Sequence, residues 1–181
     1  MLIDLNNPAF DIDIEIAYGT PNNFTGAVIY KRPRALLHPD AAEAFKRAIG
    51  LAGRLGYRFR VYDAFRPTEA QWALWRFAPG SDYVADPRRG GPHTRGIAID
   101  LTLLDAAGRP LDMGGPFDDL TPNAWHDAPV TPDQQRNRHL LLGLMTAAGW
   151  DCYLKEWWHY QLFHPRRYPS MTDAAAGAGM L

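Results

Sequence analysis

Strict alternation between acidic side chains and isoleucine runs through residues 11–16 (DIDIEI). This period of two places the isoleucines on one face of a strand and the acids on the other, as in a half-buried strand. Residues 58–65 (RFRVYDAF) alternate in the same way and predict a second strand. Between them, residues 39–55 carry apolar side chains at helical spacing and stop near Gly56, which predicts an amphipathic helix. The chain is therefore expected to cover a sheet with helices.

The remaining segments divide into helices, strands and one long loop. Helices are predicted after Pro67 and after Thr131, where Thr131-Pro132-Asp133-Gln134 has the form of a capping box. The predicted ranges are residues 68–78 and 131–148 for these helices, and residues 97–103 and 157–163 for two further strands. The Gly- and Pro-rich residues 79–92 predict a loop long enough to serve as a lid or as the wall of a site.

These elements predict one α+β domain, with an antiparallel sheet and flanking helices. No internal repeat, inter-domain linker or coiled-coil heptad interrupts the pattern. The domain is expected to cover residues 1–170. The Ala- and Gly-rich residues 171–181 carry little apolar mass and are expected to form a flexible tail.

Charge and cysteine content argue against several kinds of partner. The 181 residues carry 19 Lys and Arg against 20 Asp and Glu, so the basic excess typical of nucleic-acid binding is missing. A single cysteine, Cys152, cannot form an internal disulfide. Residues 1–20 lack the pattern of a secretory signal, and no window approaches the roughly 18 apolar residues of a membrane span. We expect a cytoplasmic protein without nucleic-acid or membrane partners, and a homo-oligomer stays open.

The segment around His93 offers the first candidate for chemistry. If a strand begins at Ile97, Asp100 projects away from the isoleucines, and Gly96 supplies the backbone freedom to fold His93 back beside it. An imidazole paired with a carboxylate suits zinc. The alternative for this segment alone is an ordinary strand with a turn-capping aspartate.

The second candidate is Glu156-Trp157-Trp158-His159. Glu156 and His159 share a face if the segment is helical, and a tight turn into a strand is the other geometry that the aromatic spacing allows. Taken alone, the tryptophans indicate core packing and the glutamate a helix cap. Together, the two segments supply three candidate ligands and one candidate base, which is the composition of an open catalytic zinc site.

These residues resemble a known family. The pattern His93-x-x-Gly96-x-Ala98-x-Asp100 with Glu156-x-x-His159 resembles the signature of the zinc D-Ala-D-Ala peptidases. The chain is most similar to the D-alanyl-D-alanine dipeptidases of the vancomycin-resistance (VanX-like) branch, over about residues 18–168. Further segments of the branch recur in the same order: Asn23-Phe24-Thr25-Gly26, Asp63-Ala64-Phe65-Arg66-Pro67 and Phe117-Asp118. The resemblance implies the α+β fold that these metallopeptidases share with hedgehog-type domains.

The resemblance also implies a role for each member of the metal motifs. It implies that His93, Asp100 and His159 bind one zinc ion per chain. It implies that Glu156 is the catalytic base, which takes a proton from the attacking water and passes it to the leaving amine.

Four residues outside the metal motifs receive roles from the same resemblance. Arg66 is implied to stabilise the negative charge of the transition state. Asp118, with Tyr18 and Asp63 in support, is implied to lie near the free ammonium of the substrate. The alternatives are a surface arginine at Arg66, a helix cap at Asp63 and a turn residue at Asp118.

Two positions depart from the family pattern. The family commonly has serine two residues before the first zinc histidine and again before the catalytic glutamate, where this chain has Gly91 and Lys155. Neither change touches the metal ligands or the base. Both bear on the preference for D-alanine at either position of the substrate.

The predicted function is zinc-dependent hydrolysis of D-alanyl-D-alanine, or a close D,D-dipeptide, to free amino acids, a reaction that bears on cell-wall biogenesis or degradation. One alternative is a D,D- or L,D-carboxypeptidase acting on cell-wall peptides. Another is a zinc-containing binding module without turnover, although such a module needs neither Glu156 nor Arg66.

Overall fold

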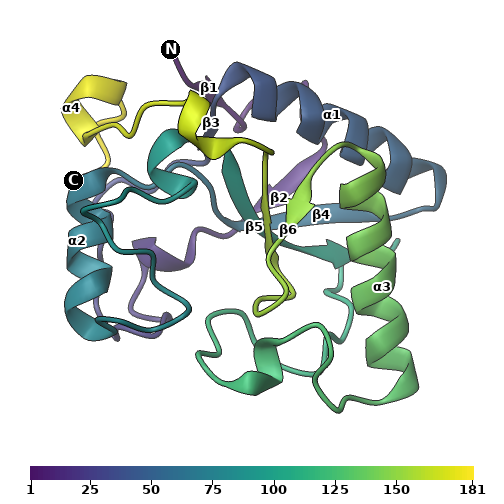
Figure 1. Cartoon of the computed structure of the whole chain (residues 1–181). Coiled ribbons are helices and arrows are strands. Elements are labelled where there is room, and N and C mark those ends of the chain that lie inside the picture. Colours follow the sequence, from purple (N-terminus) through teal and green to yellow (C-terminus); the bar gives the residue numbers. More distant parts are fainter.

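A central sheet of five strands organises the computed structural model, which describes residues 1–181 (Figure 1). Its spatial order is β2-β4-β5-β7-β6. The strands are β2 (Ile12–Ile14), β4 (Arg58–Asp63), β5 (Ala98–Leu104), β6 (Asp151–Cys152) and β7 (His159–Gln161). A separate pair of two-residue strands, β1 (Ile3–Asp4) and β3 (Leu36–Leu37), lies outside this sheet.

Helices pack against this sheet as the sequence pattern predicts. They are α1 (Pro39–Arg54), α2 (Thr68–Phe77), α3 (Pro132–Ala147) and the short α4 (Asp173–Ala176). Helix α1 buries Ala41, Phe45, Ala48 and Ala52, one stripe at helical spacing. The Phe45 ring lies 5.5 Å from the ring of Phe59 on β4. Figure 1 shows α1 and α3 together on one side, with α2 across the molecule from α3.

The α+β class is confirmed, and one detail of the sheet is different. The pairs β4–β5, β5–β7 and β7–β6 are antiparallel, but β2 runs parallel to β4. The chain between β2 and β4 contains α1, and such a long crossover returns it to the same end of the sheet. The sheet is therefore mixed.

Helix boundaries follow the local signals closely. The capping box at the start of α3 is present: Gln134 N donates to Thr131 Oγ1 at 3.4 Å, and Thr131 N donates to Gln134 Oε1 at 2.9 Å. No helix combines the length and the apolar character needed to cross a membrane.

The C-terminal residues differ from the expected flexible tail. Residues 173–176 form α4, and Ala178 and Met180 are buried in the hydrophobic core. Arg32 N donates to Met180 O at 3.0 Å, and Arg34 Nη1 donates to Ala178 O at 2.9 Å. Composition does not predict this packing, because the burial of Ala178 and Met180 depends on core residues far away in the sequence.

Candidate active site

Strand register builds one side of the site. Asp100 on β5 lies opposite Asp63 on β4 and opposite His159 on β7. Directly opposed residues on antiparallel strands project from the same face of a sheet. Three polar side chains from distant segments therefore form a row across three neighbouring strands.

An irregularity in β4 makes this row. Val61 pairs with Leu101, yet the next pair is Asp63 with Asp100, so β4 holds one extra residue, Tyr62. Strict alternation would put Asp63 on the face of Val61, toward the apolar core. A bulge of this kind re-aims the following side chain, which here brings Asp63 beside Asp100.

His93 reaches the row from a short 3-10 turn, His93–Arg95. Gly96 ends the turn with a left-handed backbone (φ +67), and a Cβ there would lie 3.2 Å from the backbone nitrogen of His38. Gly96 therefore provides the backbone freedom that the sequence predicted. Arg66 N donates to the carbonyl of His93 at 3.1 Å, which ties the turn to the residues after β4.

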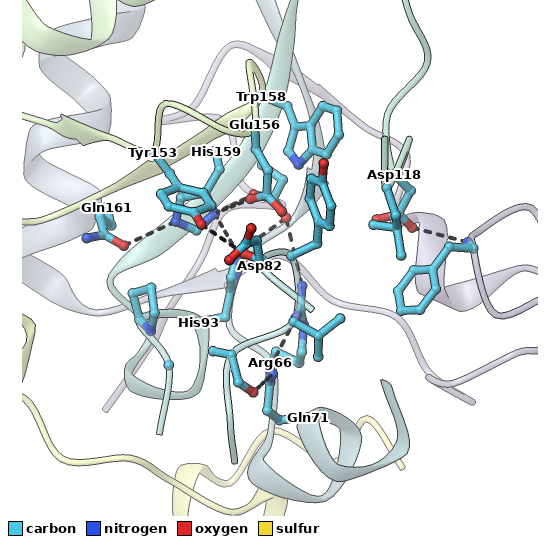
Figure 2. A pocket seen from close by; sticks show the side chains of 18 of the residues that line it. Arg66, Gln71, Asp82, His93, Asp118, Tyr153, Glu156, Trp158, His159 and Gln161 are labelled. Atoms are coloured by element: carbon cyan, nitrogen blue, oxygen red, sulfur yellow. Dashed lines mark hydrogen bonds and ion pairs between the residues drawn. The ribbon is translucent and has the colours of Figure 1, made fainter. Parts of the chain in front are cut away.

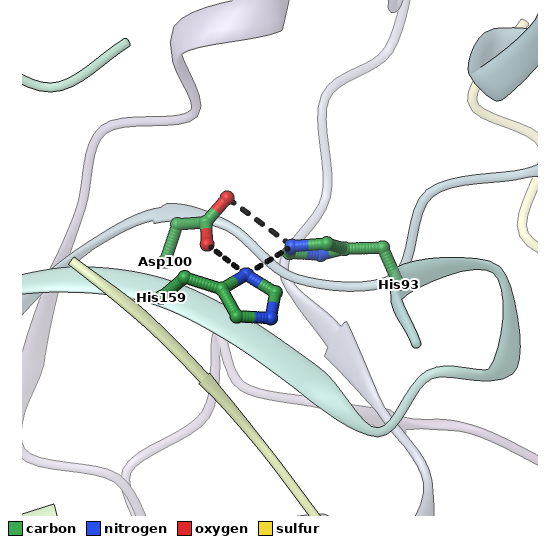
Figure 3. A group of neighbouring side chains, drawn as sticks. All are labelled: His93, Asp100 and His159. Carbon is green, nitrogen blue, oxygen red and sulfur yellow. Dashed lines mark hydrogen bonds and ion pairs between the residues drawn. The ribbon is translucent and has the colours of Figure 1, made fainter. Parts of the chain in front are cut away.

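Three ligand-type side chains converge at the row (Figure 3). His93 Nε2 lies 3.2 Å from His159 Nδ1 and 3.3 Å from Asp100 Oδ2, and His159 Nδ1 lies 2.9 Å from Asp100 Oδ1. All three side chains are buried. Against the effect of burial, the two imidazoles hold the pKa of Asp100 below its usual range.

The outer nitrogens of both imidazoles have their own partners. His93 Nδ1 lies 2.6 Å from the carbonyl of Ala64, and His159 Nε2 lies 3.2 Å from Gln161 Oε1. With hydrogens on these outer nitrogens, the inner nitrogens present lone pairs to the Asp100 carboxylate. Three acceptors facing one another fit a metal cation between them, with the outer contacts orienting the ligands.

Glu156 lies in the turn that leads into β7. Of the two geometries that the sequence allowed for residues 156–159, the chain therefore adopts the tight turn and not the helix. Glu156 Oε2 lies 3.7 Å from His159 Nδ1. The side chain is buried, and burial raises the pKa of Glu156 to about 8. The carboxyl group therefore lies at the edge of the candidate metal site.

Arg66 follows β4 and is fixed before any substrate binds. Its Nε and Nη2 both donate to Asp63 Oδ2, at 3.0 and 2.8 Å, and its Nη1 donates to Gln71 Oε1 at 3.1 Å. Nη2 also lies 3.8 Å from Asp100 Oδ2, and the guanidinium carbon lies 5.0 Å from the centre of the Tyr18 ring. Arg66 is therefore buried beside the metal ligands rather than on the surface.

Asp118 approaches from a loop on another side of the pocket. Its backbone is left-handed (φ 65), a conformation that aspartate tolerates better than most residues. Tyr18 OH donates to Asp118 Oδ1 at 2.9 Å, and Phe24 N donates to Oδ2 at 3.4 Å. Burial raises the pKa of Asp118 to about 7, against the effects of the Tyr18 hydrogen bond and the Arg66 charge.

These side chains line one pocket of about 250 Å³ (Figure 2). Seven of the eight predicted site residues line it; Asp63 lies behind Arg66 and is fully buried. Residues 82–85 and Gly91 form a wall, which confirms the site-wall prediction for the loop at residues 79–92. The small volume suits a small substrate.

Several residues of the site were missed from the sequence. Gln71 and Gln161 orient Arg66 and His159, and Tyr30 OH donates to Asp63 Oδ1 at 3.1 Å. No motif marks them. Gln161 is two residues after His159 and so shares its face of β7, a signal that could have identified it.

Comparison with known proteins identifies the family. The family described as D-ala-D-ala dipeptidase (Peptidase_M15) matches residues 1–172. The chain belongs to this family. A D-alanyl-D-alanine dipeptidase of Escherichia coli is 42% identical over 174 residues, covering 95% of this chain and 90% of its own. The family is one of metallopeptidases, which agrees with the three converging ligands.

Other members of the dipeptidase family are more distant. A D-alanyl-D-alanine dipeptidase of Enterococcus faecium is 33% identical, covering 80% of this chain and 83% of its own. One of Streptomyces coelicolor is 32% identical, with coverages of 83% and 87%. A solved L-Ala D-Glu endopeptidase of Serratia marcescens aligns with a TM-score of 0.46 and 17% identity over 72% of this chain and 84% of that one. Membership therefore rests on the sequence matches.

Proposed function

We propose that this protein is a zinc-dependent dipeptidase that hydrolyses D-alanyl-D-alanine, or a close D,D-dipeptide, to two free amino acids. The observation that carries the proposal is one small pocket lined both by a set of metal ligands and, on another side, by the Asp118 carboxylate. A free dipeptide has the ammonium group that such a carboxylate can bind. Relatives across 80–95% of the chain carry the name D-alanyl-D-alanine dipeptidase.

In this proposal His93, Asp100 and His159 would hold the zinc ion. Two imidazoles and one carboxylate are a donor set that catalytic zinc sites use, with a further position left open. When bound, zinc lowers the pKa of water and polarises the peptide carbonyl.

Glu156 acts as the base in the proposed mechanism. Its carboxylate, at the edge of the metal site, accepts a proton as water attacks the peptide carbonyl. The protonated Glu156 then donates that proton to the nitrogen of the departing amino acid. The hydroxyl of the water stays on the carbonyl carbon and its proton goes to the leaving nitrogen, so one water is consumed for each peptide bond broken.

Arg66 and Asp118 handle the charges of the substrate. Arg66 stays protonated and lies beside Asp100, so its guanidinium can stabilise the negative oxygen that forms during attack. Asp118, held by Tyr18, binds the substrate ammonium. Asp63 acts indirectly in this scheme, by fixing Arg66.

The test compares cleavage of two peptides by purified protein whose metal content has been measured. D-Ala-D-Ala should be cleaved, N-acetyl-D-Ala-D-Ala should not, and chelation should abolish turnover. Cleavage of the acetylated peptide at equal rate would instead indicate a carboxypeptidase. Glu156→Gln should lower kcat by about 10²–10⁴-fold with metal content unchanged; full activity in that variant would overturn the mechanism, and no turnover in the native protein would indicate a binding module.

Three features that the sequence indicates stay predictions. They are a cytoplasmic location, the absence of nucleic-acid and membrane partners, and a domain limit at residue 170. Fractionation of the native host is the measurement that tests location.

A further inference from the structure

One buried arginine closes the loop that carries Asp118. The loop runs from Met113 to Trp125, and both ends meet at Arg138 of α3. Arg138 Nε donates to Met113 O at 2.6 Å, Nη2 donates to Asn123 O at 2.8 Å, and Nη1 donates to Trp125 O. All three kinds of guanidinium nitrogen are used to hold backbone carbonyls of this one loop.

Burial of the charged Arg138 side chain is unfavourable for stability, so its hydrogen-bond geometry is the feature that needs explanation. Its side chain is fully buried, and burial lowers the pKa of its guanidinium, while the charge of Asp119 in the same loop acts against that effect. Taking a cation out of water is unfavourable even where a carboxylate lies nearby. An apolar side chain could cover the loop, but it could not hold three carbonyls in one fixed arrangement, as a planar guanidinium does.

Two further contacts connect the loop that Arg138 holds to segments beside the pocket. Next to Asn123, the carbonyl of Ala124 accepts a hydrogen bond of 2.9 Å from Trp157 N, the neighbour of Glu156. At the tip of the loop, Phe117 stacks 4.8 Å from the ring of Tyr62 on β4. The tip is thus held against the sheet, and the loop ends are held by Arg138 and by the segment that carries Glu156.

We propose that Arg138 is a positioning residue, which fixes the Asp118 carboxylate at the distance from the metal site that a dipeptide ammonium requires. The inference rests on the proposed function, because it takes Asp118 as the ammonium partner. Arg138 does not line the pocket and acts only through the loop. Its loss should therefore weaken substrate binding more than it slows the chemical step.

Arg138→Lys is the first variant to test. Lysine keeps the charge, but a single ammonium cannot span three carbonyls. KM for D-Ala-D-Ala should rise about tenfold or more and kcat should change less than about threefold, because the part of the loop that carries Asp118 is displaced while the three metal ligands, none of which belongs to the loop, stay in place. Arg136→Met is the matched control: Arg136 is exposed on the same helix, pairs only with Asp133 and should leave both constants unchanged.

A double-mutant cycle with Asp118→Asn separates positioning from general destabilisation. If Arg138 acts through Asp118, adding Arg138→Lys to Asp118→Asn should lower kcat/KM by less than about twofold more. Multiplying effects, or an unchanged KM in Arg138→Lys, would overturn the inference. Absence of free-dipeptide cleavage by the native protein would overturn the proposed function itself. This measurement needs no variant, so it is distinct from the test of Arg138. Arg138→Gln, which retains hydrogen-bond donors, replaces Arg138→Lys in the cycle if the lysine variant does not fold.

Discussion

The pair Asp63 and Arg66 shows how single residues create the chemistry of this pocket. Asp63 is fully buried and accepts two hydrogen bonds from Arg66 and one from Tyr30. A buried carboxylate with these partners fixes the guanidinium in one orientation. Asp63 is therefore a partner of Arg66, and its supporting role near the substrate ammonium stays a prediction.

Substitution of Arg66 tests this arrangement. Arg66→Lys should lower kcat by about 10²–10³-fold, because lysine cannot bind Asp63 through two nitrogens and still face the reacting carbonyl. Arg66→Met should in addition lower the free energy of unfolding by roughly 3–5 kcal/mol, since it leaves Asp63 buried and uncompensated. Steady-state kinetics and urea unfolding measure the two effects. Activity within tenfold of the native protein in Arg66→Lys would contradict the assigned role.

The raised pKa of Asp118 predicts a pH dependence of substrate binding. Only the ionised carboxylate attracts an ammonium group, and burial raises the pKa of Asp118 to about 7. Thus kcat/KM for the free dipeptide should fall as the pH drops below about 8, where the Glu156 base becomes protonated, and more steeply below about 7, where Asp118 does. The groups facing Asp118 are Tyr18, Arg66 and the backbone nitrogen of Phe24, and the carboxyl groups of Asp100 and Glu156 interact with it by charge. In Asp118→Asn the fall near pH 7 should be absent; an unchanged profile in that variant would assign it to another group.

At the scale of elements, length decided what the sequence could predict. Helices α1, α2 and α3 span several turns, so their periodicity and caps are readable along the chain. Strands β1, β3 and β6 have two residues each, too few for any period to appear. These short elements exist because neighbouring segments offer hydrogen-bond partners.

The packed C-terminal segment can be tested by a cavity. Met180→Ala should lower the free energy of unfolding by roughly 2–5 kcal/mol, because the methionine is fully buried. The exposed Leu55 offers a matched control, and Leu55→Ala should stay within about 0.5 kcal/mol of the native protein. Chemical unfolding measures both. Equal stability of the two variants would mean that the tail is flexible, as its composition predicted.

At the scale of the whole molecule, the site depends on the packing of segments that are far apart in the chain. Its ligands come from the turn before β5, from β5 itself and from β7. Unfolding separates them, so the metal binds the folded state alone in this proposal. A free metal concentration one hundred times the dissociation constant then stabilises the folded state by about 2.7 kcal/mol.

Zinc should therefore raise the Tm of the metal-free protein by several degrees. Asp100→Asn should lose most of this increase, because the amide removes the charged ligand. His164→Asn is the control: His164 is exposed, has a left-handed backbone that asparagine tolerates, and should leave the increase unchanged. Equal increases in the native protein and in Asp100→Asn would place the metal elsewhere.

The sequence by itself determined the fold class, the long helices, the main strands and the residues that supply the three metal-type ligands. Periodicity, caps and short motifs are local, so each is legible along the chain. Tertiary structure decided the rest: the bulge at Tyr62 that brings Asp63 beside Asp100, the burial of Met180 and the closure of the Asp118 loop by Arg138. Each of these depends on contacts between residues far apart in the chain, and such contacts leave no period in the sequence.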